Sequence, residues 1–252
     1  MTNNNMYFVA NWKMHGNTRN IESSKSIIKL SKQKKYKNHK IIYCPPYTLI
    51  KHFHKKVEKS KILIGAQDCH EILNFGPYTG SINAKLIKSA GAKFVILGHS
   101  EKRKDGDTDK VINAKIKSAL VENLKIIFCV GETLLQKRKK LTYSVLKKQI
   151  NLGLKDVKKF ANIIIAYEPV WSIGTGLLPK NEDLKKNLNG IKNILKKLKN
   201  KKNSEVKIIY GGSVTPKNVK NLVEIKEING FIIGGASLNS KKFIDILKKS
   251  TI

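Results

Sequence analysis

Cysteine, arginine and acidic residues are all scarce in this chain of 252 residues. The three cysteines, Cys44, Cys69 and Cys129, lie far apart and form no CxxC pair, so neither a disulfide framework nor a zinc site is expected. The opening stretch has no signal-peptide hydrophobic region, and no run approaches the ~20 apolar residues of a membrane span. We therefore expect a soluble, cytoplasmic protein with no metal and no membrane partner.

The shortage of acidic residues leaves a large positive charge. Only 18 aspartates and glutamates accompany 50 lysines and arginines, which gives a formal net charge of +32. A charge of this size is common in proteins that bind nucleic acid or acidic membranes. Here the charge is almost all lysine and recurs in every helix-like segment, which indicates a solvated surface and no specific nucleic-acid partner. Weak, salt-sensitive adhesion to nucleic acid stays open as an alternative.

Eight short apolar runs, rich in β-branched and aromatic residues, recur along the chain. Each has the length of a buried strand, and their continuous apolar character favours a parallel sheet covered on both faces. Amphipathic segments with helical spacing lie between the runs. This alternation, without any compositional break, predicts an α/β fold with one domain over residues 1–252, a closed eight-stranded (β/α)8 barrel; an open doubly wound sheet is the alternative. The runs begin at Tyr7, Lys40, Lys61, Lys93, Lys125, Asn162, Val206 and Gly230.

Chemically useful residues follow several of these runs, at the strand ends where such barrels place their active sites. Lys13 follows the first run, His99 the fourth and Glu168 the sixth, and glycine pairs follow the last two. Each feature alone has a structural explanation. Together they predict a carboxylate base, a lysine and an imidazole that stabilise an enediolate, and backbone N–H groups that bind phosphate. The chemistry indicated is proton transfer on a small phosphorylated carbonyl compound.

The segment after Glu168 predicts a moving lid. Its residues 169–176, PVWSIGTG, combine rigid ends with a small-residue centre, and closure would exclude water from the base. Trp171 and Ile173 are expected to be exposed in this loop, which an ordinary connection would leave unexplained. A short helix starting near Ser237 is expected to add its positive end to the phosphate site.

Eight motifs in order along the chain resemble the triosephosphate isomerase family. The resemblance spans nearly the whole sequence and implies a TIM barrel. It also implies a cofactor-free cytoplasmic isomerase of glycolysis and gluconeogenesis, which interconverts dihydroxyacetone phosphate and D-glyceraldehyde 3-phosphate through an enediolate. The motifs are NWKM at Asn11, GAQD at Gly65, YTG at Tyr78, GHSE at Gly98, CVGE at Cys129, AYEPVWSIGTG at Ala166, YGGSV at Tyr210 and GGASL at Gly234.

The resemblance also implies roles for individual residues. Lys13, held with Asn11, would stabilise the substrate oxygens. His99 would be the neutral electrophile, and Glu168 the base that moves a proton between C1 and C2. Glu101 and Cys129 would support these groups. The residues that would bind phosphate through backbone N–H groups are Gly174, Ser213, Gly234 and Gly235.

A homodimer is implied as well, in which the loop around Thr79 reaches into the neighbouring subunit and braces Asn11 and Lys13. This chain departs from the family pattern there. Ser81 replaces an acidic residue and Lys102 replaces an arginine, two groups that pair across the interface in the family. Ser81 carries no charge, so this pair cannot form here. We predict a weakened dimer with intact chemistry.

Two further alternatives concern the activity. Another phosphate-binding barrel enzyme would keep the glycine-rich turns but act on a different substrate. It would not explain why Lys13, His99 and Glu168 occur together with the lid sequence. A degenerate, inactive barrel finds no support either, because the departures fall in the motifs of the dimer interface.

Overall fold

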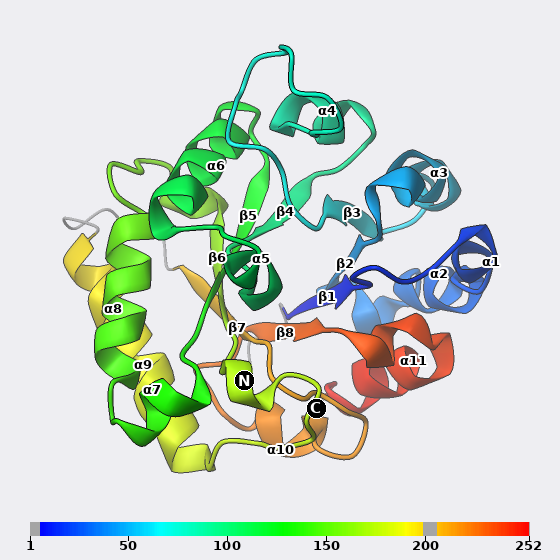
Figure 1. The fold of residues 1–252 in the computed structure, drawn as a ribbon. Coiled ribbons are helices and arrows are strands. Elements are labelled where there is room, and N and C mark those ends of the chain that lie inside the picture. Colours follow the sequence, from blue (N-terminus) through cyan, green and yellow to red (C-terminus); the bar gives the residue numbers. More distant parts are fainter. Residues whose placement is uncertain (1–5, 199–205, 252) are drawn as a thin grey trace.

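The computed structural model describes residues 6–198 and 206–251, which form a closed barrel of parallel strands (Figure 1). Neighbouring strands pair in chain order, and β8 closes the ring by pairing with β1. All eight predicted runs are strands, so the closed (β/α)8 barrel is confirmed and the open sheet is excluded. The strands are β1 (Tyr7–Asn11), β2 (Lys40–Cys44), β3 (Leu63–Ala66), β4 (Phe94–Leu97), β5 (Lys125–Val130), β6 (Ile163–Tyr167), β7 (Lys207–Tyr210) and β8 (Gly230–Ile233).

The strands are apolar on both faces because each face packs against a different cluster. Val9 and Ile127 belong to the cluster that fills the barrel, whereas Phe8 and Ile126 belong to the layer between strands and helices. All four side chains are fully buried. Since successive side chains of a strand point to opposite faces, two buried faces require an unbroken apolar run.

Helices cover the outside of the barrel (Figure 1). In α9 the apolar stripe that includes Leu184, Leu188 and Ile191 is fully buried, while Lys185 and Lys186 are exposed. The α-helices are α1 (Thr18–Glu22), α2 (Lys25–Ser31), α3 (Tyr47–Val57), α4 (Ala84–Ser89), α5 (Ser100–Lys104), α6 (Asp109–Val121), α7 (Leu134–Arg138), α8 (Thr142–Gly153), α9 (Asn181–Leu198), α10 (Val219–Val223) and α11 (Ser240–Lys249).

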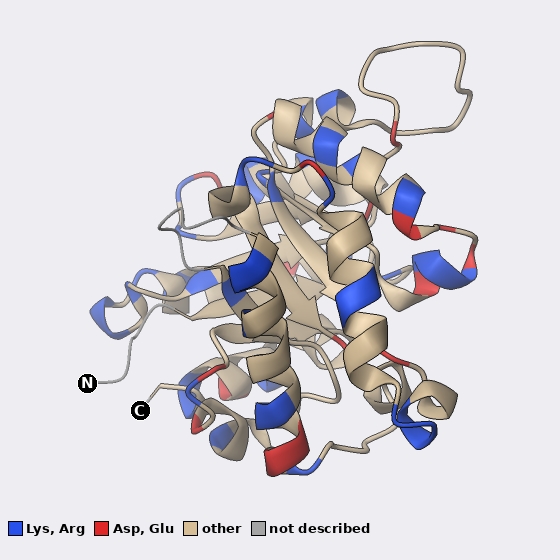
Figure 2. Cartoon of the chain, turned by 90° about the vertical axis from the view of Figure 1, so that its left-hand side faces the viewer, with Lys and Arg blue, Asp and Glu red and all other residues tan. Residues whose placement is uncertain are grey.

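The basic residues are dispersed over this outer layer. On the face shown in Figure 2, lysine and arginine lie on several separate helices and loops, interrupted by acidic residues and by uncharged surface. This distribution agrees with the predicted solvated lysine surface. Within the described ranges, no helix is long and apolar enough to cross a membrane.

Candidate active site

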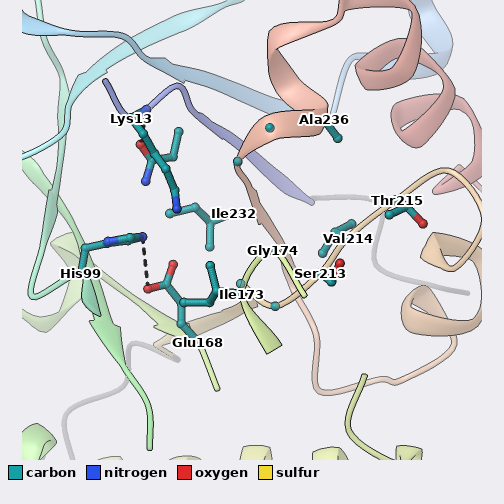
Figure 3. A pocket seen from close by; sticks show the side chains of 15 residues that line it. Lys13, His99, Glu168, Ile173, Gly174, Ser213, Val214, Thr215, Ile232 and Ala236 are labelled. Atoms are coloured by element: carbon teal, nitrogen blue, oxygen red, sulfur yellow. Dashed lines mark hydrogen bonds and ion pairs between the residues drawn. The ribbon is translucent and has the colours of Figure 1, made fainter. Parts of the chain in front are cut away.

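A cavity of about 220 Å³ lies at the carboxyl ends of the strands and brings the predicted site residues together (Figure 3). Lys13, His99 and Glu168 come from the ends of β1, β4 and β6 and all line it. The sequence analysis missed the apolar part of the wall, which includes Ile232 and Val214. The other predicted residues also line the cavity, namely Asn11, Gly174, Ser213, Gly234 and Gly235.

Lys13 is held by three neighbours in an uncommon backbone conformation. Its φ of 54° lies in the left-handed region, which side chains other than glycine rarely adopt. Its N–H donates to Asn11 Oδ1 over 3.1 Å, and its carbonyl oxygen accepts a hydrogen bond from Gln67 Nε2 over 2.8 Å. Its Nζ lies 2.7 Å from Glu101 Oε1. These contacts direct the ammonium group into the cavity, toward Glu168 (Figure 3).

The backbone of α5 orients the ring of His99. The N–H of Glu101 donates to His99 Nδ1 over 3.2 Å. A ring that accepts at Nδ1 carries its proton on Nε2. That nitrogen lies 3.8 Å from Glu168 Oε2 across the cavity (Figure 3). His99 is thus oriented to donate a hydrogen bond into the cavity.

Glu168 is a buried carboxylate whose side chain faces the cavity. The residue is only 3% exposed, and this burial raises the pKa of Glu168, although His99, the Cys129 thiol and Lys13 partly offset the shift. Among the described residues, its Oε2 has no hydrogen-bond partner. A carboxylate with a raised pKa and a free oxygen is well matched to accept a proton from carbon.

Two glycines make room for Glu168. A Cβ on Gly131 would overlap the main-chain oxygen of Glu168, and a Cβ on Gly211 would lie 2.5 Å from Glu168 Cγ. A glycine has no side chain that could take part in the chemistry, and neither residue was predicted to lie beside Glu168. The available signal was their position, since each glycine directly follows a strand run.

The predicted lid after Glu168 is a compact loop with its own hydrogen bonds. Ser172 Oγ donates to Leu177 O over 2.5 Å and lies 3.2 Å from the hydroxyl of Tyr210. Gly174 and Gly176 adopt φ angles of 71° and 78°, which let the chain turn sharply between them. The bond from Ser172 to Leu177 is internal to the loop, whereas the contact with Tyr210 connects the loop to the end of β7.

Trp171 and Ile173 are half-buried, so the prediction that they are exposed was wrong. Trp171 Nε1 donates to Glu132 Oε1 over 2.9 Å, and Lys137 Nζ lies 3.5 Å from the centre of the indole ring. Ile173 lines the cavity with Ile232, near Glu168 (Figure 3). Trp171 therefore anchors the loop, and Ile173 forms part of an apolar wall beside Glu168.

Two of the predicted phosphate-binding residues, Gly174 and Ser213, lie on the opposite side of the cavity from His99 (Figure 3), and Gly234 and Gly235 line the cavity as well. The short helix expected near Ser237 is a 3₁₀ helix, η4 (Gly235–Leu238), and α11 begins at Ser240. A Cβ built on Gly235 would meet nothing, which leaves open space in front of this backbone. Within the described residues, no group of three or more histidine, cysteine, aspartate or glutamate side chains is arranged to hold a metal ion.

Comparison with known proteins agrees with this geometry. The family model for triosephosphate isomerase matches residues 6–250. The triosephosphate isomerase of Thermodesulfovibrio yellowstonii is 38% identical over 244 residues, covering 96% of this chain and 98% of the relative. That of Saccharomyces cerevisiae is 37% identical over 244 residues, covering 96% and 97%. The crystal structure of triosephosphate isomerase from Bartonella henselae is similar with a TM-score of 0.88 at 33% identity, covering 97% of this chain and 98% of the other. The chain therefore belongs to the triosephosphate isomerase family of isomerases.

Proposed function

We propose that this chain interconverts dihydroxyacetone phosphate and D-glyceraldehyde 3-phosphate. The observation that carries the proposal is the convergence of a lysine, an imidazole and a buried carboxylate on one small cavity. The Glu168 carboxylate removes a proton from C1 of the ketose; the electron pair of the C–H bond forms the C1–C2 double bond, and the carbonyl π pair moves to the C2 oxygen. The hydroxyl proton on the C1 oxygen then passes to the C2 oxygen, a carbonyl forms at C1, and the protonated Glu168 delivers its proton to C2.

The negative charge of the enediolate needs donors that are already in place. Lys13 Nζ supplies a positive charge and His99 Nε2 supplies a hydrogen bond, and both groups are held by the backbone contacts described above. Preorganised donors of this kind stabilise a transition state without having to reorganise during the reaction. Asn11 contributes by holding the N–H of Lys13.

The phosphate group of the substrate binds through backbone N–H groups on the far side of the cavity. Gly174 belongs to the lid, whereas Ser213, Gly234 and Gly235 follow β7 and β8. Phosphate binding therefore links the lid to the fixed part of the barrel. Binding energy from this remote group closes the lid and removes water from Glu168.

The first test is the activity itself and its dependence on pH. We expect the wild-type chain to isomerise D-glyceraldehyde 3-phosphate in a coupled assay. Burial raises the pKa of Glu168, so kcat/KM should fall, as the pH decreases, at values above the ordinary pKa of a glutamate, because the base is active only when deprotonated. A folded wild-type protein without activity would contradict the proposal and point to another phosphate-binding barrel enzyme.

Ionisation of the substrate phosphate, with a pKa of about 6, can produce a similar acid limb and must be separated. Glu168→Asp shortens the base and changes its surroundings, so a limb that belongs to the base should move in this variant. A limb that stays at the same pH in both proteins belongs to the substrate and would leave the raised pKa of Glu168 without kinetic support.

We also propose that the protein is a homodimer. The connection between β3 and α4 projects from the barrel (Figure 1), and its Phe75 is 70% exposed in the single chain. Met14, next to Lys13, is 94% exposed. Apolar side chains this exposed favour a surface covered by a second copy. Lys102 Nζ lies 3.2 Å from Asp105 Oδ2 of its own chain. This intrachain ion pair is consistent with the loss of the family's charge pair across the interface.

The dimer should be weaker than one that keeps this charge pair. We expect sedimentation velocity to show dissociation at nanomolar concentration. The double substitution Ser81→Glu with Lys102→Arg should lower the dissociation constant by about two- to thirtyfold, since a symmetric dimer gains two pairs of about 0.2–1 kcal/mol each. Lys104→Arg, an exposed lysine on the same helix, is the control. The weakening is wrong if the wild type stays dimeric at nanomolar concentration or the double variant binds no more tightly.

We propose a cytoplasmic location from the state of the cysteines. Cys44, Cys69 and Cys129 are free and buried, as expected in a reducing compartment. Burial raises the pKa of Cys129 well above its ordinary value. The group beside Glu168 is therefore a thiol and not a reactive thiolate.

A further inference from the structure

The first residue after β5 is fastened by a side chain from another part of the barrel wall. Gly131 N donates to Gln149 Oε1 over 2.9 Å, and Gln149 Nε2 donates to Gly131 O over 3.1 Å. Gln149 lies on α8, and its planar amide forms the two bonds that a neighbouring strand would form with Gly131. These bonds satisfy backbone groups at a point where β5 has already ended.

The main chain of Glu168 rests on this same short segment. The N–H of Glu168 donates to Val130 O over 2.8 Å, and the N–H of Val170 donates to Glu132 O over 3.0 Å. Between these two bonds, Gly131 lies so close to the carbonyl of Glu168 that a Cβ would not fit. The position of residues 130–132 therefore determines the position of the backbone that carries Glu168.

The side chain of Glu132 connects this segment to residues on both sides of Glu168. Its carboxylate is 1% exposed and accepts hydrogen bonds from the hydroxyl of Tyr167 over 3.2 Å and from Trp171 Nε1 over 2.9 Å. Tyr167 directly precedes Glu168, and Trp171 belongs to the lid. A shift of residues 130–132 would thus move Glu168 and the start of the lid together.

We propose that Gln149 is a positioning residue for the isomerisation. Gln149 does not itself line the cavity and acts through Gly131, whose peptide group it holds against α8. The role needs a donor and an acceptor in one planar group, and the amide of glutamine has both. An ionised glutamate has no donor, and methionine has neither a donor nor a planar group. This inference rests on the proposed role of Glu168 as the base, because misplacement of the base is what would lower the rate.

Two substitutions test the inference by their dependence on pH. Gln149→Met removes both hydrogen bonds, and we expect kcat to fall by about tenfold to a hundredfold at every pH, since small misplacements of a reacting group cost about this much. Gln149→Glu keeps the shape but loses the donor when ionised. Its kcat relative to wild type should rise as the pH falls, because a protonated carboxyl again offers one donor and one acceptor.

Asn113 provides a matched control for the loss of amide hydrogen bonds. Its Nδ2 donates to Gly153 O over 2.9 Å and to Lys155 O over 3.0 Å, at and just beyond the C-terminal end of α8 and outside the cavity wall. Asn113→Leu should lower the urea midpoint without lowering kcat. Circular dichroism and urea unfolding of all variants separate a local displacement from a loss of folding.

The outcomes distinguish this inference from the proposed function. If the wild type is active and Glu168→Gln is not, but Gln149→Met retains the wild-type kcat, the positioning role of Gln149 is wrong. It is also wrong if Gln149→Glu and Gln149→Met show the same dependence on pH. If Glu168→Gln retains activity, the assignment of the base fails first, whatever the result at Gln149.

Discussion

Replacing Glu168 by glutamine should lower kcat by about 10²–10⁴-fold, the usual contribution of a positioned general base. The amide has the shape of the carboxylate but cannot accept the proton from carbon. The measurement is the coupled assay with D-glyceraldehyde 3-phosphate. Glu182→Gln makes the same chemical change on the exposed first turn of α9 and should leave kcat unchanged. Equal rates for wild type and Glu168→Gln would remove Glu168 from the chemistry.

The same substitution should stabilise the protein in mildly alkaline buffer. Burial raises the pKa of Glu168, so the folded protein favours its protonated form. The stability that this group contributes is fully present below the ordinary pKa of a glutamate and is lost as the pH rises through the raised value. Glutamine cannot ionise and avoids that loss. The urea midpoint of the variant should exceed that of the wild type, and the difference should shrink as the pH falls.

Replacing Lys13 by methionine should lower kcat by about 10²–10³-fold, the loss expected for one preorganised donor at a developing oxyanion. Methionine keeps an unbranched apolar stem but brings no charge to the cavity. The effect should appear in kcat as well as in KM, because the enediolate carries more negative charge on its oxygens than the substrate does. Glu101, whose Oε1 lies 2.7 Å from Lys13 Nζ, would also lose its partner.

Lys56 offers a matched control for the loss of a lysine from an ion pair. Its Nζ lies 2.8 Å from Glu22 Oε1, and its side chain is 29% exposed against 27% for Lys13. Lys56→Met therefore removes a lysine with a similar partner distance and similar exposure, on α3 and outside the cavity wall. We expect wild-type kcat for this variant. If both variants lose activity to the same extent, the effect of Lys13→Met is structural.

The strands and the main site residues were predictable because their signals are local. A strand buried on two faces needs an unbroken apolar run, and eight such runs separated by amphipathic helices specify a barrel. Lys13, His99 and Glu168 could be chosen because each directly follows a run, and parallel strands in a barrel end at the same rim. Chain order and position were sufficient to predict that these three residues line one cavity.

The prediction for Trp171 failed because the outcome depended on a contact between distant segments. Trp171 is half-buried, and Glu132, in the connection after β5, accepts its indole N–H. These partners meet only after the chain has folded, so no local pattern marks the contact. The short helix expected near Ser237 is present as the 3₁₀ helix η4, which begins at Gly235.

Residue type and spacing alone specify the order of strands and helices, the family and the chemical groups available at the rim of the barrel. How these groups behave depends on contacts made in the folded chain. Burial raises the pKa of Glu168, whose side chain fits only because Gly211 has no Cβ, and His99 is oriented because the N–H of Glu101 donates to its Nδ1. Gln149 acquires a role only because α8 packs beside the end of β5. Burial and hydrogen bonding depend on the closed barrel, whereas residue type and spacing do not.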